Sequence, residues 1–303
     1  MIELTILGSS SATPAFKRHL SAQLVSHNER LFLIDCGEGT QFQMMRYKTR
    51  IQRLDAIFIS HLHGDHFFGL PGLLCSLSNH ERTRPLKIIC PEGLPEVLFQ
   101  LLKASDTRLK YELEFHLLKG KNSEMVFENS SLSVSSIPLK HRVYCNGYLF
   151  QEKPKARKFL MTKAKADLIP VQYFHLLKQG NNIVLDNQHE YRSSDYLGEA
   201  PKSFSYAYCS DTRYFSELAN SVKGVDLLYH EATFLEELKH KAESTFHSTA
   251  KEAGMLAREA QAGKLIIGHF SARYLDLQPL LTEAQQEFPN TYLAEEGVIV
   301  KIK

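Results

Sequence analysis

Residues 60–66, SHLHGDH, concentrate side chains that bind metals: His61, His63, Asp65 and His66 directly follow an apolar run. Neutral imidazoles and a carboxylate at this spacing can project toward one point if the chain turns sharply, and Gly64 permits such a turn. Three histidines and an aspartate exceed what one tetrahedral metal needs beside ligands from elsewhere. The cluster therefore predicts half of a two-metal site, the alternatives being a single zinc ion or an exposed polar loop.

Three further candidate ligands each follow an apolar segment: His141, Asp211 and His269. Taken singly, each has an ordinary explanation, because a lone histidine is often a hydrogen-bonded or surface residue and Asp211 could cap a helix. Together they share one position, the carboxyl end of a predicted strand, where α/β sheets gather their ligands. With the first cluster they make seven ligands, enough for two metal ions if one carboxylate bridges them.

The elements that must position these residues alternate between strands and helices, in two similar halves. This order predicts an α/β fold in which helices cover the outer faces of two sheets, a four-layer αβ/βα sandwich with an inserted arm. The predicted helices include 94–105 and 249–263, and the main predicted strands are 2–8, 21–28, 30–37, 54–61, 86–91, 112–118, 124–129, 132–139, 204–210, 225–231, 264–270 and 298–302.

Composition narrows the class of protein. The 303 residues are 43% hydrophobic with a formal charge of only +2, which predicts a compact globular chain without a global field for a polyanion. No apolar run approaches the length of a membrane span and the first residues lack the features of a signal peptide, so a cytoplasmic location is expected. Five scattered cysteines without a C-x-x-C pair indicate reduced thiols, which leaves histidine and aspartate to hold any metal.

Residues 151–201 interrupt the alternation and predict a basic arm inserted into a single domain of residues 1–303. Between residues 151 and 178 lie seven basic side chains (Lys153, Lys155, Arg157, Lys158, Lys163, Lys165, Lys178) against two acids (Glu152, Asp167). Two interpretations stay open from the insert alone: an RNA-contacting arm, and a solvated charged helix packed on the body.

The sequence resembles the metallo-β-lactamase superfamily through its His-x-His-x-Asp-His pattern and, within it, the ribonuclease Z family of tRNA 3′-end endonucleases. Four more motifs fall in the family's order: PAFKRHLSA (14–22), HEATF (230–234), HST (247–249) and GHFSARY (268–274). The resemblance implies a zinc-dependent endoribonuclease that removes the 3′ trailer of precursor tRNA, leaves a 3′ hydroxyl and acts as a homodimer. It places His61, His63 and His141 on one Zn²⁺, Asp65, His66 and His269 on the other, and Asp211 between them. Mn²⁺ or another divalent ion is compatible with the same ligands.

The resemblance also implies roles for side chains outside this ligand set. Asp65 would accept a proton, while His247, oriented by Glu231, would contact the scissile phosphate or protonate the departing oxygen. By residue type alone, His247 could instead lie near a helix cap and Glu231 could be a surface acid. Lys17, Arg18 and Arg273 are candidates for RNA phosphate contacts.

The sequence departs from the family pattern at two places, of which the first concerns substrate docking. The insert has Ile169-Pro170 and lacks the Gly-Pro of the bacterial arm, and His19 replaces an asparagine that is frequent in the family. The alternative functions are a related phosphodiesterase acting on small molecules and a catalytically silent RNA-binding relative. The basic insert opposes the first, and retention of all seven ligands opposes the second.

Overall fold

The computed structural model describes residues 1–15, 17–185 and 189–302. Phe16, in the PAFKRHLSA motif, and residues 186–188, in the predicted insert, lie outside the described residues. The chain forms two compact units. We call residues 1–128, 132–151 and 204–303 the core unit, and residues 129–131 and 152–203 the insert unit.

The first sheet of the core unit has seven strands in the order β16-β1-β2-β3-β4-β5-β6. Strands β3, β4, β5 and β6 are parallel to one another, and β1 pairs antiparallel with both β2 and β16. The strands are β1 (Ile2–Gly8), β2 (Ala22–His27), β3 (Arg30–Ile34), β4 (Leu54–Phe58), β5 (Leu86–Pro91), β6 (Leu113–Leu118) and β16 (Ile299–Ile302).

The second sheet also has seven strands, in the order β15-β14-β13-β12-β9-β8-β7. Its parallel part runs from β12 to β15, and β12 pairs antiparallel with β9. Strand β9 was not predicted, and it overlaps the first two residues of the predicted insert. The strands are β7 (Met125–Glu128), β8 (Leu132–Pro138), β9 (Asn146–Glu152), β12 (Ser205–Cys209), β13 (Leu227–Glu231), β14 (Leu265–Gly268) and β15 (Thr291–Leu293).

The central strands β3, β4 and β5 are near-continuous apolar runs and are buried on both faces, whereas the edge strand β6 is largely exposed. Phe32 and Phe58 belong to the core between the two sheets, together with Phe150 and Tyr206 of the second sheet. Leu33 and Ile57, one residue out of phase with them, pack toward α3 and α4. The ring of Phe150 lies 5.3 Å from that of Phe58 and 6.1 Å from that of Phe32, so aromatic contacts join the sheets.

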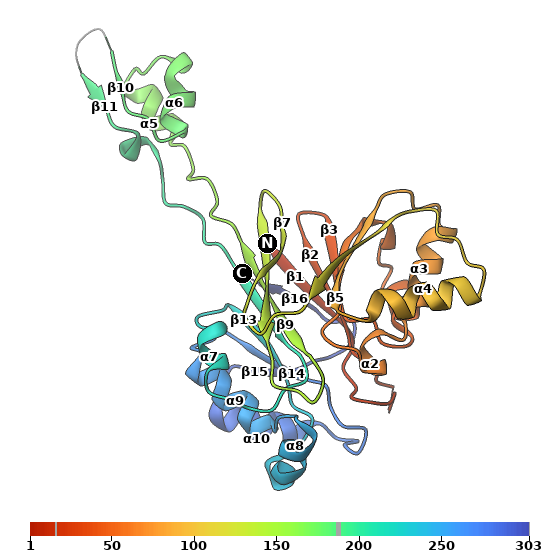
Figure 1. The fold of residues 1–303 in the computed structure, drawn as a ribbon. Helices are drawn as coiled ribbons and strands as arrows, with labels where there is room; N and C mark the ends of the chain where they lie inside the picture. The colour runs from red at the N-terminus through yellow and green to blue at the C-terminus, as the bar shows by residue number, and fades with distance from the viewer. Residues whose placement is uncertain (16, 186–188, 303) are drawn as a thin grey trace. The chain divides into compact units, whose positions relative to one another are not determined.

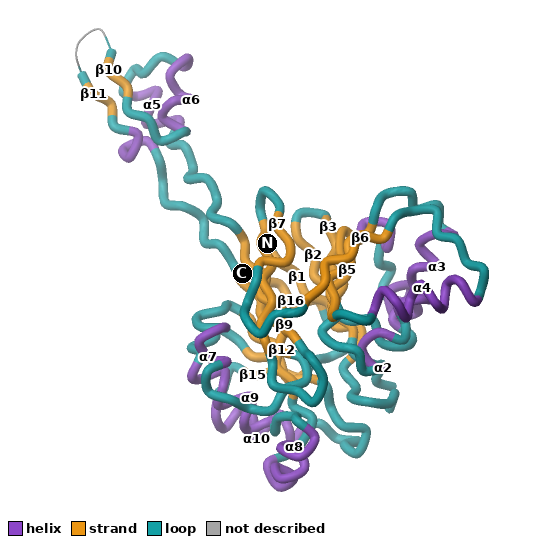
Figure 2. Tube along the Cα trace, in the orientation of Figure 1, coloured by secondary structure: helices purple, strands orange, loops and turns teal. Residues whose placement is uncertain are grey.

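Helices cover the outer faces of the core unit, with α3 and α4 on one side and α7, α9 and α10 on the other (Figure 1; Figure 2 shows the strands between them). The predicted four-layer α/β arrangement is therefore confirmed. The helices are α1 (Thr40–Arg46), α2 (Gly64–Phe67), α3 (Leu70–Asn79), α4 (Leu94–Ala104), α7 (Leu218–Ser221), α8 (Lys239–Thr245), α9 (Ala250–Glu259) and α10 (Gln278–Glu287), with single 3₁₀ turns η1 (Ile51–Arg53) and η4 (Glu236–Leu238). Within the described ranges, every helix is too short or too polar to span a bilayer.

The insert unit folds around a small core of its own. Ile169, Phe174, Leu177 and Tyr196 are buried together there with Ala164 and Ile183. The Tyr196 hydroxyl donates a hydrogen bond of 2.7 Å to a carboxylate oxygen of Asp167. Its elements are α5 (Met161–Ala166), η2 (Val171–Tyr173), α6 (Phe174–Lys178), β10 (Ile183–Val184), β11 (Glu190–Tyr191) and η3 (Ser193–Tyr196).

The aromatic contacts between the sheets predict a stability difference between two phenylalanine positions. Phe150 is fully buried, so Phe150→Ala should lower the free energy of unfolding by about 3–5 kcal/mol through lost burial and a residual cavity. Phe42 on α1 is 65% exposed, and Phe42→Ala should change that free energy by less than about 0.5 kcal/mol. Urea titrations followed by circular dichroism measure both variants; equal midpoints would contradict the assignment of Phe150 to the core.

Candidate metal centre

The histidine cluster lies where the chain leaves β4 and turns into the short helix α2. His63 precedes α2 in an extended conformation, and α2 begins at Gly64. A side chain at position 64 would place its Cβ 2.3 Å from the exposed ring of Phe68, which would have to move. His61 and His66 are fully buried, whereas His63 and Asp65 are half-buried and line a cavity.

The other three predicted ligands also come from strand ends. His141 follows β8, Asp211 follows β12, and His269 immediately follows β14 in a left-handed backbone conformation (φ 58°). All three lie in the core unit, and the structure brings them to the His61–His66 cluster. Asp211 is buried, and the next helix, α7, has Glu217 as its N-cap, so the helix-cap explanation of Asp211 is wrong.

The first group of donor atoms comes from His61, His63, His141 and Asp211. Nδ1 of His63 lies 3.0 Å from Nε2 of His61 and 3.2 Å from Nε2 of His141. Oδ2 of Asp211 lies 3.5 Å from Nε2 of His61 and 3.8 Å from Nε2 of His141. A tetrahedral zinc with bonds of about 2.0–2.1 Å separates its ligand atoms by about 3.3–3.4 Å, so this spacing fits a metal ion.

The second group comes from Asp65, His66 and His269. Nε2 of His66 and Nε2 of His269 are 3.3 Å apart, and Oδ2 of Asp65 lies 3.5 Å from each of them. Asp211 reaches this group with its other oxygen, Oδ1, which lies 3.4 Å from Nε2 of His66 and 3.2 Å from Nε2 of His269. One carboxylate therefore presents a different oxygen to each group.

The charges around the two groups also suit cations. Burial opposes ionisation of Asp65 and Asp211, but neighbouring imidazoles including His66 and His269 outweigh it and hold the pKa of both carboxyls well below the usual range. Burial lowers the pKa of His61 well below its ordinary value, which keeps a neutral ring that can donate a lone pair to a metal. For His66, burial acts in the same direction, but Asp211, Asp65 and Asp35 outweigh it and raise its pKa. These carboxylates favour positive charge at the cluster.

Asp35, a carboxylate that was not predicted to belong to the site, contacts the candidate ligands on the side away from the cavity. Asp35, which follows β3, is fully buried, and its Oδ2 accepts hydrogen bonds from His66 Nδ1 (2.8 Å), Ser60 Oγ (2.9 Å) and the Tyr208 hydroxyl (2.7 Å). Ser60 Oγ also lies 3.0 Å from Nδ1 of His61. Asp35 and Ser60 thus contact the Nδ1 atoms of His66 and His61 and leave the Nε2 atoms of both rings facing the donor groups. Partners of metal-binding histidines commonly orient the ring in this way.

Glu231 and His247 form a buried pair beside the second group. Glu231 is fully buried; its Oε1 accepts from His247 Nδ1 at 2.8 Å, and its Oε2 accepts from the Thr233 hydroxyl at 2.7 Å. Burial opposes charge on His247, but Glu231 outweighs it and raises the pKa of His247 to about 9. The surface-acid interpretation of Glu231 is wrong. His247 does lie near a helix cap, because Thr249, two residues later, is the N-cap of α9 and forms a capping box with Glu252.

The two groups open into a cavity of about 690 Å³. Phe68, which is 65% exposed, and Arg142 line it, and the sequence analysis had assigned a role to neither. Its described lining residues are Ser11, Ala12, Thr13, Pro14, Leu20, Glu38, His63, Gly64, Asp65, Phe68, His141, Arg142, Asp211, Ser244, Thr245, His247 and His269.

The three predicted RNA contacts lie outside the described lining of this cavity. The guanidinium of Arg18 donates to the carbonyl oxygens of Tyr274 (3.0 Å) and Ser271 (3.5 Å), which fastens its loop to the 271–274 segment. Arg273 lies over the Phe234 ring and donates from Nε to Ser271 Oγ. Lys17 is exposed and has a left-handed backbone (φ 65°).

His19, the residue that departs from the family pattern, has a specific partner. Its backbone N–H donates to Oε1 of Glu296 at 2.6 Å, and its Nδ1 lies 2.7 Å from Oε2 of the same carboxylate. Gln43 Nε2 donates to that second oxygen at 2.9 Å. The carbonyl of His19 accepts from Ser10, and the same N-terminal loop donates from Ala12 N to Oδ2 of Asp65 at 2.8 Å. Glu296 therefore anchors the loop that contacts Asp65.

Comparison with known proteins gives full-length similarity. The chain is 48% identical over 296 residues to the ribonuclease Z of Cytophaga hutchinsonii, covering 97% of this chain and 94% of that protein. It is 42% identical over 300 residues to the ribonuclease Z of Parabacteroides distasonis, covering 99% of each. The crystal structure of the short form of human tRNase Z matches with a TM-score of 0.72 and 26% identity, covering 99% of each chain. Residues 2–168 match the family model described as Anti-Pycsar protein Apyc1.

The buried contacts of Asp35 predict that it controls metal affinity. Asp35→Asn replaces one acceptor oxygen by an amide donor, which cannot accept from His66, Ser60 or Tyr208, and should weaken zinc affinity about 10- to 100-fold. Competition with a chromophoric chelator measures the affinity, and circular dichroism checks the fold. Asp106→Asn, at a side chain that is 92% exposed, is the matched control. Wild-type affinity in the Asp35 variant would contradict this role.

Proposed function

We propose that this chain, which belongs to the ribonuclease Z family of the metallo-β-lactamase superfamily, is a zinc-dependent endoribonuclease that removes the 3′ trailer from precursor tRNA. The cut would leave a 3′ hydroxyl on the tRNA. The observation that carries the proposal is identity of 42–48% with curated ribonuclease Z proteins over nearly the whole chain, which includes both the donor groups and the insert. The proposal extends to a homodimer, as the family resemblance implies, and to a cytoplasmic location.

The donor geometry supports a site for two metal ions. His61, His63 and His141 would hold one ion, Asp65, His66 and His269 the other, and Asp211 would bridge them through Oδ2 and Oδ1. Zinc is the proposed ion, and Mn²⁺ or another divalent ion is compatible with nitrogen and oxygen donors. When bound, such ions stabilise charge on a phosphoryl group and lower the pKa of water.

Asp65 is the proposed proton acceptor during attack on the phosphodiester. Its Oδ2 accepts from Ala12 N at 2.8 Å, so the N-terminal loop fixes the orientation of the carboxylate. The neighbouring imidazoles hold the pKa of Asp65 below its usual range, which keeps the group ionised at neutral pH. The side chain lines the cavity, where it is within reach of a substrate.

His247 is the proposed proton donor to the departing oxygen. Glu231 holds its Nδ1, which leaves Nε2 for the substrate in the cavity. A pKa of about 9 means that the imidazole carries its proton at neutral pH. Thr233 holds Glu231 in turn and also lies 3.0 Å from Nδ1 of His269, so the pair is positioned relative to the second donor group.

The insert unit is the proposed docking surface for the body of the tRNA. Its exposed basic side chains include Lys158, Lys165 and Lys178, and phosphate contacts of this kind bind RNA without reading its sequence. The absence of Gly-Pro at Ile169-Pro170 does not prevent formation of a packed unit, because Ile169 contributes to its core. The proposed docking surface therefore rests on a fold of its own.

Cleavage of a 3′-extended precursor tRNA by the zinc-loaded protein tests this function. We expect one cut near the discriminator base, loss of that cut in Asp65→Ala, and a kcat lower by about 10²- to 10⁴-fold in His247→Ala. His240→Ala, at an exposed histidine of α8, should match wild type. Turnover of bis(p-nitrophenyl) phosphate with intact precursor tRNA would instead favour a phosphodiesterase acting on small molecules.

The docking role of the insert makes a separate prediction. The double variant Lys158→Glu/Lys165→Glu should raise KM for precursor tRNA at least about 10-fold, because phosphate contacts are lost, and leave turnover of bis(p-nitrophenyl) phosphate unchanged. Lys103→Glu/Lys121→Glu makes the same change of net charge at exposed positions of the core unit and should have a smaller effect. Equal KM values for the two double variants would show that only net charge matters.

A further inference from the structure

The geometry points to Arg142 as a substrate-binding residue whose guanidinium contacts the scissile phosphate. This inference deepens the proposed function and rests on its premise that the substrate is a phosphodiester. Arg142 directly follows the candidate ligand His141, on the connection between β8 and β9. Its exposed side chain lines the same cavity as both donor groups.

Hydrogen bonds fix the backbone before and after Arg142. The N–H of Leu139 donates to the carbonyl of Cys145 at 3.1 Å, which closes the loop, and the N–H of Arg213 donates to the carbonyl of Lys140 at 3.0 Å. Nδ1 of His141 lies 2.9 Å from the carbonyl of Phe246. The loop is therefore fixed to the segments that carry Asp211 and His247, so Arg142 has a defined place before substrate binds.

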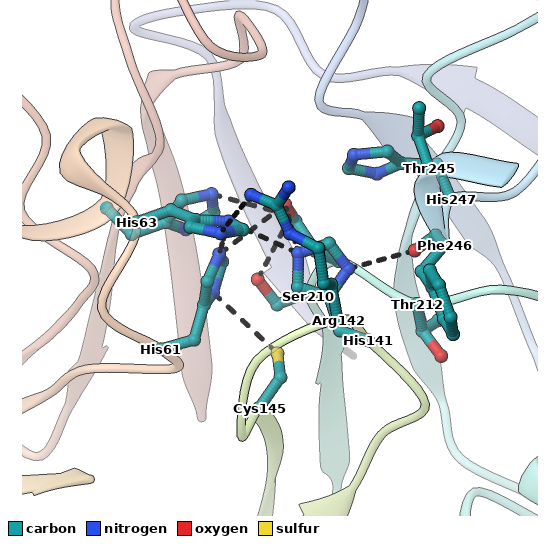
Figure 3. A network of polar contacts seen from close by, with 12 residues as sticks. His61, His63, His141, Arg142, Cys145, Ser210, Thr212, Thr245, Phe246 and His247 are labelled. Atoms are coloured by element: carbon teal, nitrogen blue, oxygen red, sulfur yellow. Dashed lines mark hydrogen bonds and ion pairs between the residues drawn. The ribbon is translucent and has the colours of Figure 1, made fainter. Parts of the chain in front are cut away.

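The side chain of Arg142 reaches over the first donor group. Its Nη2 lies 3.4 Å from Nε2 of His63, the ring nitrogen opposite the Nδ1 that faces His61 and His141. Figure 3 shows the guanidinium beside these imidazoles. The cation thus lies beside the first donor group and on the cavity into which that group opens.

Among the described residues, no acidic side chain forms an ion pair with Arg142, whose guanidinium contacts Nε2 of His63 instead. Of the described side chains that line the cavity, Arg142 alone is a lysine or arginine, whereas Glu38, Asp65 and Asp211 are acidic. Negative charge builds up on the phosphoryl oxygens of a diester as it is hydrolysed, and a cation fixed beside the donor groups stabilises that charge. Arg142 can supply this cation, with two parallel N–H donors.

A purely structural role would produce different contacts. Arg18 donates to the carbonyl oxygens of Tyr274 and Ser271, and Arg82 donates to those of Arg84 and Pro85. Both guanidinium groups thereby fasten neighbouring backbone. Among the described residues, the Arg142 guanidinium makes one long contact, to Nε2 of His63, and the side chain is exposed and lines the cavity. This arrangement suits a ligand better than a scaffold.

The test compares Arg142→Ala and Arg142→Lys with the zinc-loaded wild type on precursor tRNA and on bis(p-nitrophenyl) phosphate. Both substrates contain the diester, so Arg142→Ala should lower kcat/KM roughly 10²-fold on each, with Arg142→Lys in between because it keeps the charge and loses the planar fork. Bound zinc should stay at the wild-type level. Arg108→Ala, whose side chain is 89% exposed, is the control and should match wild type.

A binding measurement without turnover gives a second readout. In the Asp65→Ala background, adding Arg142→Ala should weaken binding of precursor tRNA and reduce the slope of log K against log salt by about one phosphate contact. An unchanged slope together with wild-type kcat/KM on both diesters would overturn the inference. Loss of zinc in parallel with activity would also overturn it, because Arg142 would then act by holding His63.

The same experiments separate this inference from the proposed function. Hydrolysis of bis(p-nitrophenyl) phosphate that depends on Arg142, with precursor tRNA left intact, would support the phosphate contact and contradict the tRNA substrate. Cleavage of both substrates that is insensitive to Arg142→Ala would support the proposed function and contradict the inference. No turnover of either diester by the wild type would overturn both.

Discussion

The carboxylate of Asp35 joins the two sheets at the edge where the metal donors gather. It follows β3 of the first sheet and accepts from Ser60 and His66 beyond β4, while Tyr208 of β12 donates to it from the second sheet. A buried carboxylate is costly unless it is fully hydrogen-bonded, so these donors must converge if the chain is to fold. The same carboxylate therefore stabilises both the packing of the two sheets and the orientation of His66.

The local part of the site could be predicted because its signal is local. His61, His63, Asp65 and His66 lie within six residues after an apolar strand, and the strand supplies the rigid support that metal ligands need. His141, Asp211 and His269 are distant in sequence but share one kind of position, the end of a strand. Alternation of strands and helices was enough for the four-layer fold, since both sheets follow from the apolar pattern of their strands.

The missed features depend on contacts between distant segments. Nothing near Asp35 indicates that it meets Tyr208, and Glu296 reaches His19 across 277 positions. Residue type favoured a surface position for Glu231 because acids are seldom buried; its burial is tolerated because His247, Thr212 and Thr233 satisfy it. Strand β9 was not predicted because it runs into a charged insert. Its position in the second sheet depends on antiparallel pairing with the distant strand β12.

The insert unit has its own core of six buried residues, among them Phe174 and Tyr196, which is separate from the two cores of the larger unit. Substitutions on its surface therefore affect a unit whose core contains none of the donor residues. Selection for a different RNA partner could alter this segment while the hydrolytic centre stayed under its own, stricter constraint. Divergence within the family should accordingly be faster in residues 152–203 than around the strand ends that carry the histidines.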